Sequence, residues 1–455
     1  MSLSVIVLAA GRGKRMRSET PKVLHPLAGR PLLAHVLDRA RELEAAAIYV
    51  VHGHGTDRVR AAFPARDLTW CLQAEQLGTG HAVAQALPGI PDDHDVLVLY
   101  GDVPLVRGAT LRELLGAGRR CAVLTAVVPD PAGYGRVVRR SGRIVKIVEQ
   151  KDATPEEAGI AEINTGIMSV PAKDLRRWLA RVRNDNTQGE YYLTDVISTA
   201  FAEGVEVLGV QIDDPEEVAG INDKVQLAHA ERAFQRAAAR ELMLQGVTIA
   251  DPGRIDIRGR VTAGADVFLD VGVILSGDVH LGDRVRIGPN SLVTDSTLGA
   301  DTIVHANSII DGATTEGACE IGPFARLRPG TELAARAKIG NFVEVKMSRI
   351  DTGSKVNHLS YIGDAAVGAH VNVGAGTITC NYDGAVKHRT TIGDDAFIGS
   401  GVMLVAPVEI GAGATVGAGS TITKDAPAGT LTVARARQTT VEAWRRPVKK
   451  NPEHG

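Results

Sequence analysis

A glycine-rich turn that carries several cations follows the first apolar run of the chain. It has the sequence AAGRGKRM over residues 9–16. Glycines expose backbone N–H groups, and Arg or Lys side chains neutralise negative charge, so this composition is typical of a phosphate-binding turn. It is not a Walker loop, because no Gly-Lys-Ser/Thr follows, and Met16 stands where a dinucleotide-binding turn has its third glycine. The alternative is an ordinary strand-to-helix turn with solvated basic side chains.

A carboxylate stands just past the end of another apolar run. Asp102 follows residues 96–99 within the segment LYGDVPL. At the end of a strand, a carboxylate can hold a hard divalent cation that bridges phosphate oxygens. A single aspartate at such a place is more often a turn residue, so the metal-site interpretation depends on what surrounds it.

Such residues need a sheet to position them, and the first half of the chain predicts one. Short apolar runs at 5–9, 48–51, 96–99 and 123–127 alternate with helix-like segments such as 32–44. This alternation predicts a mostly parallel sheet with helices on both faces, and ligands at the carboxyl ends of its strands. Residues 223–245 are rich in Ala, Gln, Glu and Arg, which predicts one long helix leading to the second half.

Aliphatic residues recur every six positions in the second half. They are Ile392, Ile398, Leu404, Ile410, Val416 and Ile422, and glycine follows four of the six directly. This period fits a β-solenoid in which one aliphatic side chain per hexad points inward and three hexads close a triangular coil. The pattern continues upstream less regularly. Interruptions such as 380–391 predict loops, which in solenoids often build the binding surface.

Composition limits the remaining possibilities. A chain of 455 residues is too long for one core, so at least two domains are expected. A net charge of −2 gives no electrostatic case for nucleic acid or for an anionic membrane. The four cysteines have no paired spacing and predict neither disulfides nor a zinc site. The N-terminal stretch lacks the pattern of a secretory or membrane-spanning segment, so a cytoplasmic protein is expected.

Several segments of the first half resemble the sugar-1-phosphate nucleotidylyltransferases. With the hexads behind them, nearly the whole chain is similar to the bacterial family of bifunctional N-acetylglucosamine-1-phosphate uridylyltransferase/glucosamine-1-phosphate N-acetyltransferases. The most specific segments are PKVLH, EQLGTGHAV, YGDVPL, YGRVV, VEQKDA and EINTGI, then ARLRPG, NFVEVK, NHLSYIGDA and VNVGAGTITCNYDG.

The resemblance implies an α/β fold class with three parts. These are a Rossmann-like nucleotidylyltransferase domain at 1–228, a linker helix at 229–248, and a left-handed parallel β-helix of hexapeptide repeats at 249–455. It also implies UDP-N-acetylglucosamine synthesis from UTP and acetyl-CoA with Mg²⁺. The expected assembly is a homotrimer with acetyl-CoA sites between subunits, with small-molecule substrates and without nucleic-acid or membrane partners.

In the first domain, the resemblance assigns residues to UTP and to UDP-N-acetylglucosamine. Asp102 and Asn222 match the Mg²⁺ ligands. The nucleotide and phosphate contacts match Leu8, Ala9, Ala10, Gly11, Lys22, Gln73, Gly78 and Thr79, and the sugar contacts match Tyr100, Gly101, Gly135, Glu149 and Asn164. Such a list fits in-line phosphoryl transfer, where catalysis rests mainly on positioning and charge neutralisation.

In the solenoid, the resemblance makes His358 the general base that accepts a proton from the glucosamine amine, with Glu344 as a candidate to orient or polarise it. A histidine suits this role because its ordinary pKa lies near neutrality. The acceptor sugar phosphate would contact Arg328, Lys346, Tyr361 and Asn372. Acetyl-CoA would contact Ala375, Asn381, Tyr382, Ser400, Ala418 and Arg435. The basic tail at 445–450 would reach a neighbouring subunit or a phosphate, or else be disordered.

Two other interpretations stay open on sequence alone. One is a single-activity sugar nucleotidylyltransferase whose solenoid only trimerises or regulates it. The other is a hexad protein that binds zinc through His358, His370 and His388, since solenoids can hold a metal between subunits.

Overall fold

The chain divides into two compact units, Met1–Ala238 and Ala239–Gly455. The computed structural model describes residues 2–11, 13–53, 57–116 and 120–447. Arg12 of the glycine-rich turn and residues 448–450 of the basic tail therefore lie outside the described residues.

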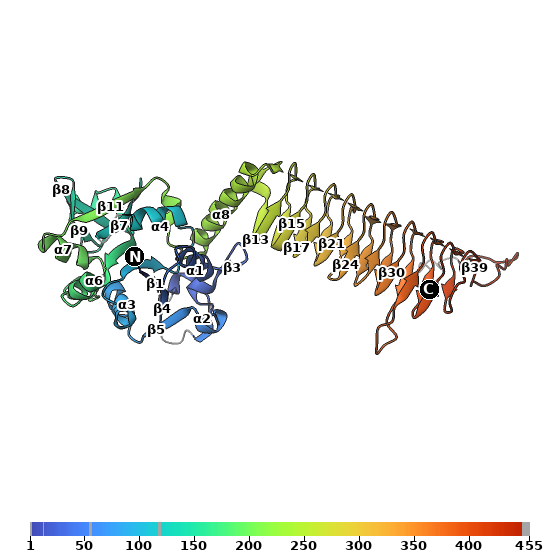
Figure 1. Ribbon diagram of the computed structural model, residues 1–455, viewed down its shortest axis with the longest axis horizontal. Coiled ribbons are helices and arrows are strands. Elements are labelled where there is room, and N and C mark those ends of the chain that lie inside the picture. Colours follow the sequence, from blue (N-terminus) through green and yellow to red (C-terminus); the bar gives the residue numbers. More distant parts are fainter. Residues whose placement is uncertain (1, 12, 54–56, 117–119, 448–455) are drawn as a thin grey trace, which may run out of the picture. The chain divides into compact units, whose positions relative to one another are not determined.

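Unit 1 is built on a nine-stranded mixed sheet with the order β11-β7-β10-β6-β1-β4-β5, and β8 and β9 extend it beside β10 (Figure 1). Its strands are β1 Leu3–Leu8, β4 Ala47–Gly53, β5 Leu68–Gln73, β6 Asp95–Tyr100, β7 Cys121–Val127, β8 Gly135–Arg140, β9 Arg143–Val148, β10 Glu162–Pro171 and β11 Val207–Ile212. A two-stranded ribbon, β2 Pro26–Leu27 with β3 Arg30–Pro31, lies apart from it. Strands β1, β4, β5 and β6 are mutually parallel, as predicted, whereas β10 runs antiparallel to both β6 and β7.

Both faces of the sheet are buried along its central strands, so β1, β6 and most of β7 are almost continuously apolar. Alternate residues of β1 enter two different clusters, Ile6 and Leu8 on one face and Val5 and Val7 on the other. Helices cover these faces, which explains the continuous apolar runs of the sequence. The helices are α1 Leu32–Glu42, α2 Asp57–Ala62, α3 Thr79–Ala86, α4 Gly108–Leu115, α5 Pro155–Ala158, α6 Ala172–Leu179 and α7 Asp195–Ala202.

Helix α8, Lys224–Leu244, spans the division between the two units and lies within the stretch predicted to be helical. Its first half belongs to the core of unit 1, because Ala230 packs in a cluster with Leu27, Leu32 and Ile221. Phe234 lies against that cluster and stacks edge-on on the His35 ring. The sequence-based boundary at residue 228 falls inside this helix.

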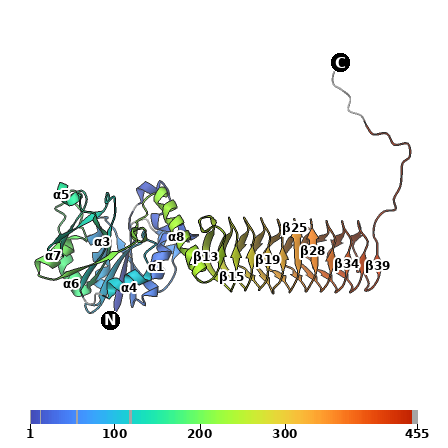
Figure 2. The same cartoon turned by 90° about the horizontal axis from the view of Figure 1, so that it is seen from above.

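Unit 2 is a parallel β-helix of hexapeptide repeats, as predicted, with short strands stacked in columns (Figure 2). One column forms an 11-stranded sheet: β12 Thr248–Ile249, β14 Phe268–Leu269, β16 Arg286–Ile287, β19 Ile303–Val304, β22 Glu320–Ile321, β25 Lys338–Asn341, β28 Lys355–His358, β31 Asn372–Val373, β34 Phe397–Ile398, β37 Thr415–Val416 and β39 Leu431–Thr432. The winding direction stays a prediction of the resemblance.

The other two faces of the prism form a 17-stranded sheet. Its strands are β13 Asp256–Ala263, β15 Ile274–Leu281, β17 Leu292–Thr294, β18 Thr297–Leu298, β20 Ile309–Asp311, β21 Ala313–Thr315, β23 Arg326–Leu327, β24 Thr331–Leu333, β26 Glu344–Lys346, β27 Arg349–Ile350, β29 Tyr361–Gly363, β30 Ala365–Val367, β32 Ile378–Cys380, β33 Thr390–Ile392, β35 Met403–Val405, β36 Val408–Ile410 and β38 Thr421–Ile422.

The hexad aliphatics form the solenoid core. Ile321, Ile339, Val356 and Val373 stack in successive coils and are buried. The predicted loop after Cys380 is present at residues 381–389, closed by a bridge between Tyr382 and Lys387, and it projects from the stacked coils in Figure 1.

Candidate active sites

A cavity of about 320 Å³ opens in unit 1 at the carboxyl ends of β1, β5 and β6. It brings together ten of the sequence-predicted residues: Leu8, Ala9, Ala10, Gly11, Lys22, Gln73, Gly78, Thr79, Tyr100 and Asp102. These residues come from four separate stretches of the chain. They converge because parallel strands place the loops that follow them along one edge of the sheet.

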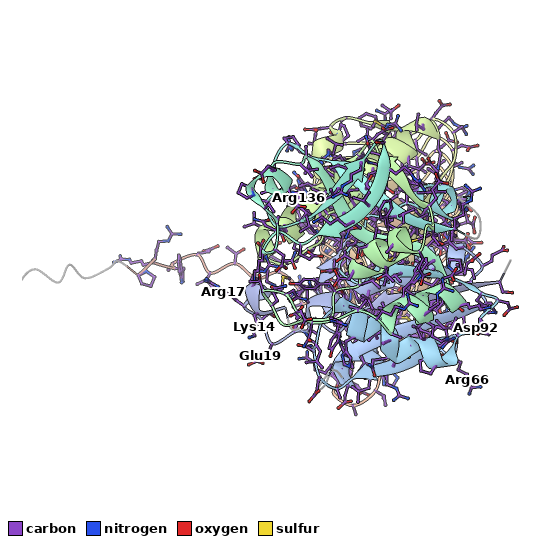
Figure 3. The ribbon with its side chains drawn as sticks, turned by 90° about the vertical axis from the view of Figure 1, so that its left-hand side faces the viewer. Lys14, Arg17, Glu19, Arg66, Asp92 and Arg136 are labelled. Carbon is purple, nitrogen blue, oxygen red and sulfur yellow. The ribbon has the colours of Figure 1, made fainter. Side chains whose placement is uncertain are left out.

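The glycine-rich turn shapes this cavity through its backbone. Gly13 has φ +56°, and a Cβ atom there would lie 2.8 Å from the Cβ of Lys22, so only glycine lets Lys22 approach. Lys14 and Arg15 are exposed and do not line the cavity; Figure 3 shows Lys14 and Arg17 at the surface of the molecule. Among the described residues, Lys22 is the cation that lines the cavity.

Lys22 joins the two residues that the resemblance assigns to Mg²⁺. Its ammonium forms an ion pair with Asp102 Oδ2 and donates a hydrogen bond to Asn222 Oδ1 at 3.2 Å. The backbone holds this group together, since the Ile221 N–H donates to the Asp102 carbonyl oxygen at 2.9 Å. A carboxylate and an amide oxygen are the hard donors that Mg²⁺ prefers, and they already hold a cation here.

Two of the predicted nucleotide contacts, Gly78 and Thr79, are held by the segment 190–193. The Leu193 N–H donates to Thr79 Oγ1 at 3.0 Å, and a Cβ atom on Gly78 would lie 2.6 Å from the Tyr191 carbonyl oxygen. Gln73 is buried and uses Nε2 to bond to the Gly78 carbonyl at 3.1 Å. Among the described residues, its Oε1 accepts no hydrogen bond, so it can accept a ligand N–H.

Four lining residues of this cavity were not singled out from the sequence, the apolar Val23 and Ala82 and the polar Gln76 and Glu190. The side-chain amide of Gln76 donates a hydrogen bond to the Ala10 carbonyl oxygen and so connects the loop after β5 to the glycine-rich turn. Glu190, in the segment 190–193, also lines the cavity. Gln76 lies inside the segment EQLGTGHAV, which was the available signal, whereas Glu190 lies outside every segment that carries the resemblance.

The predicted sugar contacts form a second group beside Tyr100. Strand pairing places Asn164 opposite Gly135, and a Cβ atom on Gly135 would lie 3.5 Å from the Glu149 carboxylate. The Gly166 N–H donates to Asn164 Oδ1 at 3.1 Å. Gly101 is buried behind the cavity, where its N–H donates to the Leu8 carbonyl oxygen at 2.9 Å. None of Gly101, Gly135, Glu149 and Asn164 lines the described cavity itself.

Burial controls the ionisable groups of this second group. It raises the pKa of Glu149, against a hydrogen bond from Thr194 Oγ1 at 3.1 Å that lowers it. Burial also raises the pKa of Tyr100, and the nearby carboxylates of Glu149 and Asp102 add to the effect. The Tyr100 hydroxyl is therefore a neutral donor at any physiological pH.

In unit 2, five predicted residues lie along a single corner of the prism. Backbone bonds link successive coils there, from the Gly376 N–H to the His358 carbonyl oxygen at 3.4 Å and from the Gly401 N–H to that of Ala375 at 2.7 Å. The next step joins the Gly419 N–H to the Ser400 carbonyl oxygen at 2.8 Å. The guanidinium of Arg435 donates to the Ala418 carbonyl oxygen at 2.6 Å. His358 thus heads a line of small residues, which leaves room for a thin ligand.

The contacts of His358 and Glu344 differ from the predicted pairing. His358 Nδ1 lies 2.6 Å from Asn341 Oδ1, whereas Glu344 accepts a hydrogen bond from Arg328 at 2.8 Å. The strand register explains the difference, because Asn341 is opposite His358 and Glu344 is opposite Tyr361. Among the described residues of one chain, no hydrogen bond joins Glu344 to His358.

Cations gather beside this pair. The pKa of Lys346 is lowered, first by the ammonium of Lys387 and further by Arg328. Like charges placed together in this way favour an anionic ligand such as a phosphate. Lys387 was not singled out from the sequence, because it lies in the loop 381–389, whose path no repeat predicts.

The remaining predicted residues of unit 2 surround these cations or the corner. Asn381 is buried and donates its amide to Asp364 and, at 3.5 Å, to the Tyr361 hydroxyl. Asn372 is half-buried on β31, one coil after Lys355. Tyr382 is 61% exposed, and its hydroxyl bonds to the Gly384 carbonyl within the projecting loop.

Neither a metal cluster nor a membrane span is found in the part of the chain that the structure describes. No group of three or more His, Cys, Asp or Glu residues there could hold a metal ion, so His358, His370 and His388 form no such group within one chain. His388 instead bonds to Asp383 at 2.6 Å. Across the same described ranges, no helix is both long and apolar enough to cross a bilayer.

Comparison with known proteins places both units in described families. The model of the MobA-like NTP transferase domain matches residues 5–165, and that of the bacterial transferase hexapeptide (six repeats) matches residues 389–424. The chain is 58% identical to "Bifunctional protein GlmU" of Alkalilimnicola ehrlichii over 100% of this chain and 98% of that protein. The proteins of the same name from Stenotrophomonas maltophilia and Xanthomonas axonopodis pv. citri are 57% and 59% identical, over 99% of this chain and 99% and 100% of theirs.

Proposed function

The chain belongs to the family of bifunctional GlmU proteins, and from this we propose how its residues divide two transferase reactions between the two units. It is a bifunctional enzyme of UDP-N-acetylglucosamine synthesis, acting on UTP and acetyl-CoA. The observation that carries the assignment is the corner of unit 2. There a histidine heads a line of small residues and a cluster of cations lies beside it.

Unit 1 transfers UMP. A phosphate oxygen of N-acetylglucosamine-1-phosphate attacks the α-phosphorus of UTP, the new P–O bond forms, and the bond to pyrophosphate breaks. We assign Gln73, Gly78 and Thr79 to the uracil, and the turn 8–11 with Lys22 to the phosphates. Tyr100, Gly101, Gly135, Glu149 and Asn164 are assigned to the acetylated sugar. The contacts of these side chains support positioning and not covalent catalysis.

Asp102 and Asn222 fit a Mg²⁺ ion. Both offer hard oxygen atoms, and in this structure both contact the positively charged Lys22 ammonium where a metal ion would bind. When bound, the ion supplies neutralisation of the charge that develops on the phosphate oxygens. Lys22 lines the cavity proposed to hold the nucleotide, so we propose that it leaves Asp102 for a phosphate oxygen, and this exchange would free the carboxylate for the metal.

Unit 2 transfers acetyl. The nitrogen of glucosamine-1-phosphate attacks the thioester carbon of acetyl-CoA, the C–N bond forms and the C–S bond breaks. We assign His358 to accept the amine proton, while the departing thiolate takes up a proton to give free CoA. Arg328 and Lys346, with Lys387, would hold the sugar phosphate, and Tyr361 and Asn372 the sugar. Glu344 would act through Arg328.

Acetyl-CoA would lie along the corner that carries Ala375, Ser400 and Ala418, with Arg435 at its far end and Asn381 and Tyr382 beside it. We further propose a homotrimer with this site between subunits. Phe324, Phe342 and Leu359 support it, because they are 49%, 55% and 60% exposed at one corner, next to His358. Light scattering should give three times 48.0 kDa, and a monomer would contradict the proposal.

A single experiment separates this assignment from a nucleotidylyltransferase with a merely structural solenoid. The protein is incubated with glucosamine-1-phosphate, acetyl-CoA, UTP and Mg²⁺ while free thiol and pyrophosphate are followed. We expect thiol release to require only the first two substrates and pyrophosphate release to follow it. Pyrophosphate release from added N-acetylglucosamine-1-phosphate without any thiol release would establish the single-activity alternative.

A further inference from the structure

We propose that Asn341 is the positioning residue for His358, holding the imidazole in the tautomer whose Nε2 can accept the amine proton. The inference deepens the proposed acetyl-transfer site and rests on it.

The geometry of two neighbouring coils carries the inference. Asn341 ends β25, His358 ends β28, and the two residues are opposite one another in the parallel register. Asn341 Oδ1 lies 2.6 Å from His358 Nδ1. The backbone fixes the same pair, since the Leu359 N–H donates to the Asn341 carbonyl oxygen at 3.1 Å. The side-chain contact is therefore held by the ladder of the solenoid and not by a mobile loop.

The chemistry of the contact selects one tautomer. An amide oxygen is only an acceptor, so the ring nitrogen that faces it must carry a hydrogen. With the proton on Nδ1, the lone pair of the neutral ring is on Nε2, which is the nitrogen left for the substrate. Without this acceptor, the ring can rotate or take the opposite tautomer, and a fraction of the enzyme loses its base.

The other coils do not provide such a pair at this corner. The equivalent positions before the turn are held by apolar residues or serine: Val271, Pro289, Ala306, Pro323, Ala375, Ser400 and Ala418. Among the described residues at this corner position, Asn341 is thus the polar side chain stacked next to His358. Glu344, the residue that the sequence suggested for this role, is held by Arg328 at 2.8 Å and lies 3.9 Å from Arg326.

The charged groups near His358 leave the amide as the ring's partner. A groove shared with His358 is lined by His305, Glu320 and Lys338. These three bond to one another, with Glu320 accepting from Lys338 at 2.7 Å and lying 3.0 Å from His305 Nε2. Arg328, Lys346 and Lys387 lie on the neighbouring face, where the phosphate is proposed to bind.

The test compares two variants of the full-length enzyme. Asn341→Ala should lower acetyl-transfer kcat about ten- to a hundredfold. This loss is smaller than the full contribution of a general base, about 10²–10⁴-fold, because part of the enzyme keeps the correct tautomer. The KM values for acetyl-CoA and glucosamine-1-phosphate should stay within about twofold. Asn341→Asp keeps an acceptor for Nδ1–H, so it should restore most of the turnover. Its carboxylate also stabilises the imidazolium, which should move the acidic limb of the pH–rate profile to higher pH.

Asn357→Ala is the matched control, because Asn357 lines the same groove and its buried side-chain oxygen has no partner among the described residues. It should keep acetyl transfer within about threefold. Uridylyl transfer by every preparation reports folding. Parental turnover in Asn341→Ala, or an Asn341→Asp enzyme with the low turnover and unmoved pH profile of Asn341→Ala, would overturn the proposal. Loss of the base assignment itself has a different signature, namely parental acetyl transfer in His358→Ala.

Discussion

Removing the ammonium of Lys22 should strengthen divalent-metal binding in the absence of nucleotide, although Lys22 is also the residue that we assign to the nucleotide phosphates. Lys22 holds both proposed metal ligands, Asp102 and Asn222, through its Nζ atom. A metal ion that binds to these two side chains must first break their contacts with Lys22. Lys22→Met keeps the length of the side chain and removes the charge, so the two oxygens become available without competition.

The size of the effect follows from the contact. The side chains of Lys22 and Asp102 are only 12% and 16% exposed, so solvent screens their interaction little. Hydrogen bonds to charged groups contribute roughly 1.5–3 kcal/mol, and about 1.4 kcal/mol corresponds to a factor of ten. Lys22→Met should therefore raise metal affinity about tenfold to about a hundredfold.

Paramagnetic resonance of Mn²⁺, which takes the same hard oxygen ligands as Mg²⁺, measures this directly. Lys173→Met is the control, since Lys173 is exposed on α6. Adding UTP should reduce the difference in Mn²⁺ affinity between Lys22→Met and the parent, because its phosphates supply ligands to the ion and a new partner to Lys22. Equal Mn²⁺ affinity in Lys22→Met and parent would refute the reasoning. So would a gain that survives in an Asp102→Asn background, because the competition is assigned to that carboxylate.

Three further predictions follow. Asp102→Ala should nearly abolish uridylyl transfer and spare acetyl transfer; equal loss of both activities would indicate misfolding. His358→Ala should cost roughly 10²–10⁴-fold in acetyl-transfer turnover with uridylyl transfer within about twofold, and an unchanged acetyl-transfer rate would end the base assignment. A fragment ending at residue 245 should retain uridylyl transfer alone. One ending at 228 loses Ala230 and Phe234 from its core and should melt at a lower temperature; equal melting temperatures would contradict the packing argument.

The unit 1 site was predictable where it depends on strands. Lys22 and Asp102 are 80 residues apart in sequence, yet both lie at the edge to which parallel strands deliver their loops. Asn222 follows a short 3-10 helix and no strand, so no periodic pattern predicts it, and the resemblance alone identified it. The cations of the glycine-rich turn were the weaker signal. Their number suggested neutralisation of phosphate, but Lys14 and Arg15 are exposed.

In unit 2, the sequence predicted the coils that hold the site, but not which side chain contacts His358. Hexads predict the stacking of aliphatic residues, and the stack is present. The partner of His358 depends on how many residues each coil contains. Glu344 is fourteen residues upstream of His358, short of a full coil of three hexads, and so it lies on the next face. Asn341 lies one coil back, which was the signal that the sequence offered.

The corner position next to His358 has a left-handed backbone in successive coils, but the residue type there changes from bulky side chains to glycine. Phe324, Phe342 and Leu359 have φ values of 56°, 55° and 51°, a left-handed conformation that is unfavourable for bulky side chains, and all three are exposed. From Gly376 onward, glycine takes the corner position, and the line of Ala375 and Ser400 begins. In a monomeric solenoid, these exposed apolar side chains would add no stability at positions where glycine would avoid the backbone strain. The change from bulk to glycine occurs between Leu359, which follows His358, and Gly376 on the next coil, at the end of the surface assigned to acetyl-CoA. This placement fits the proposed acetyl-CoA site with its reactive end at His358, and in the proposed trimer the apolar corner would be covered by a second copy of the chain.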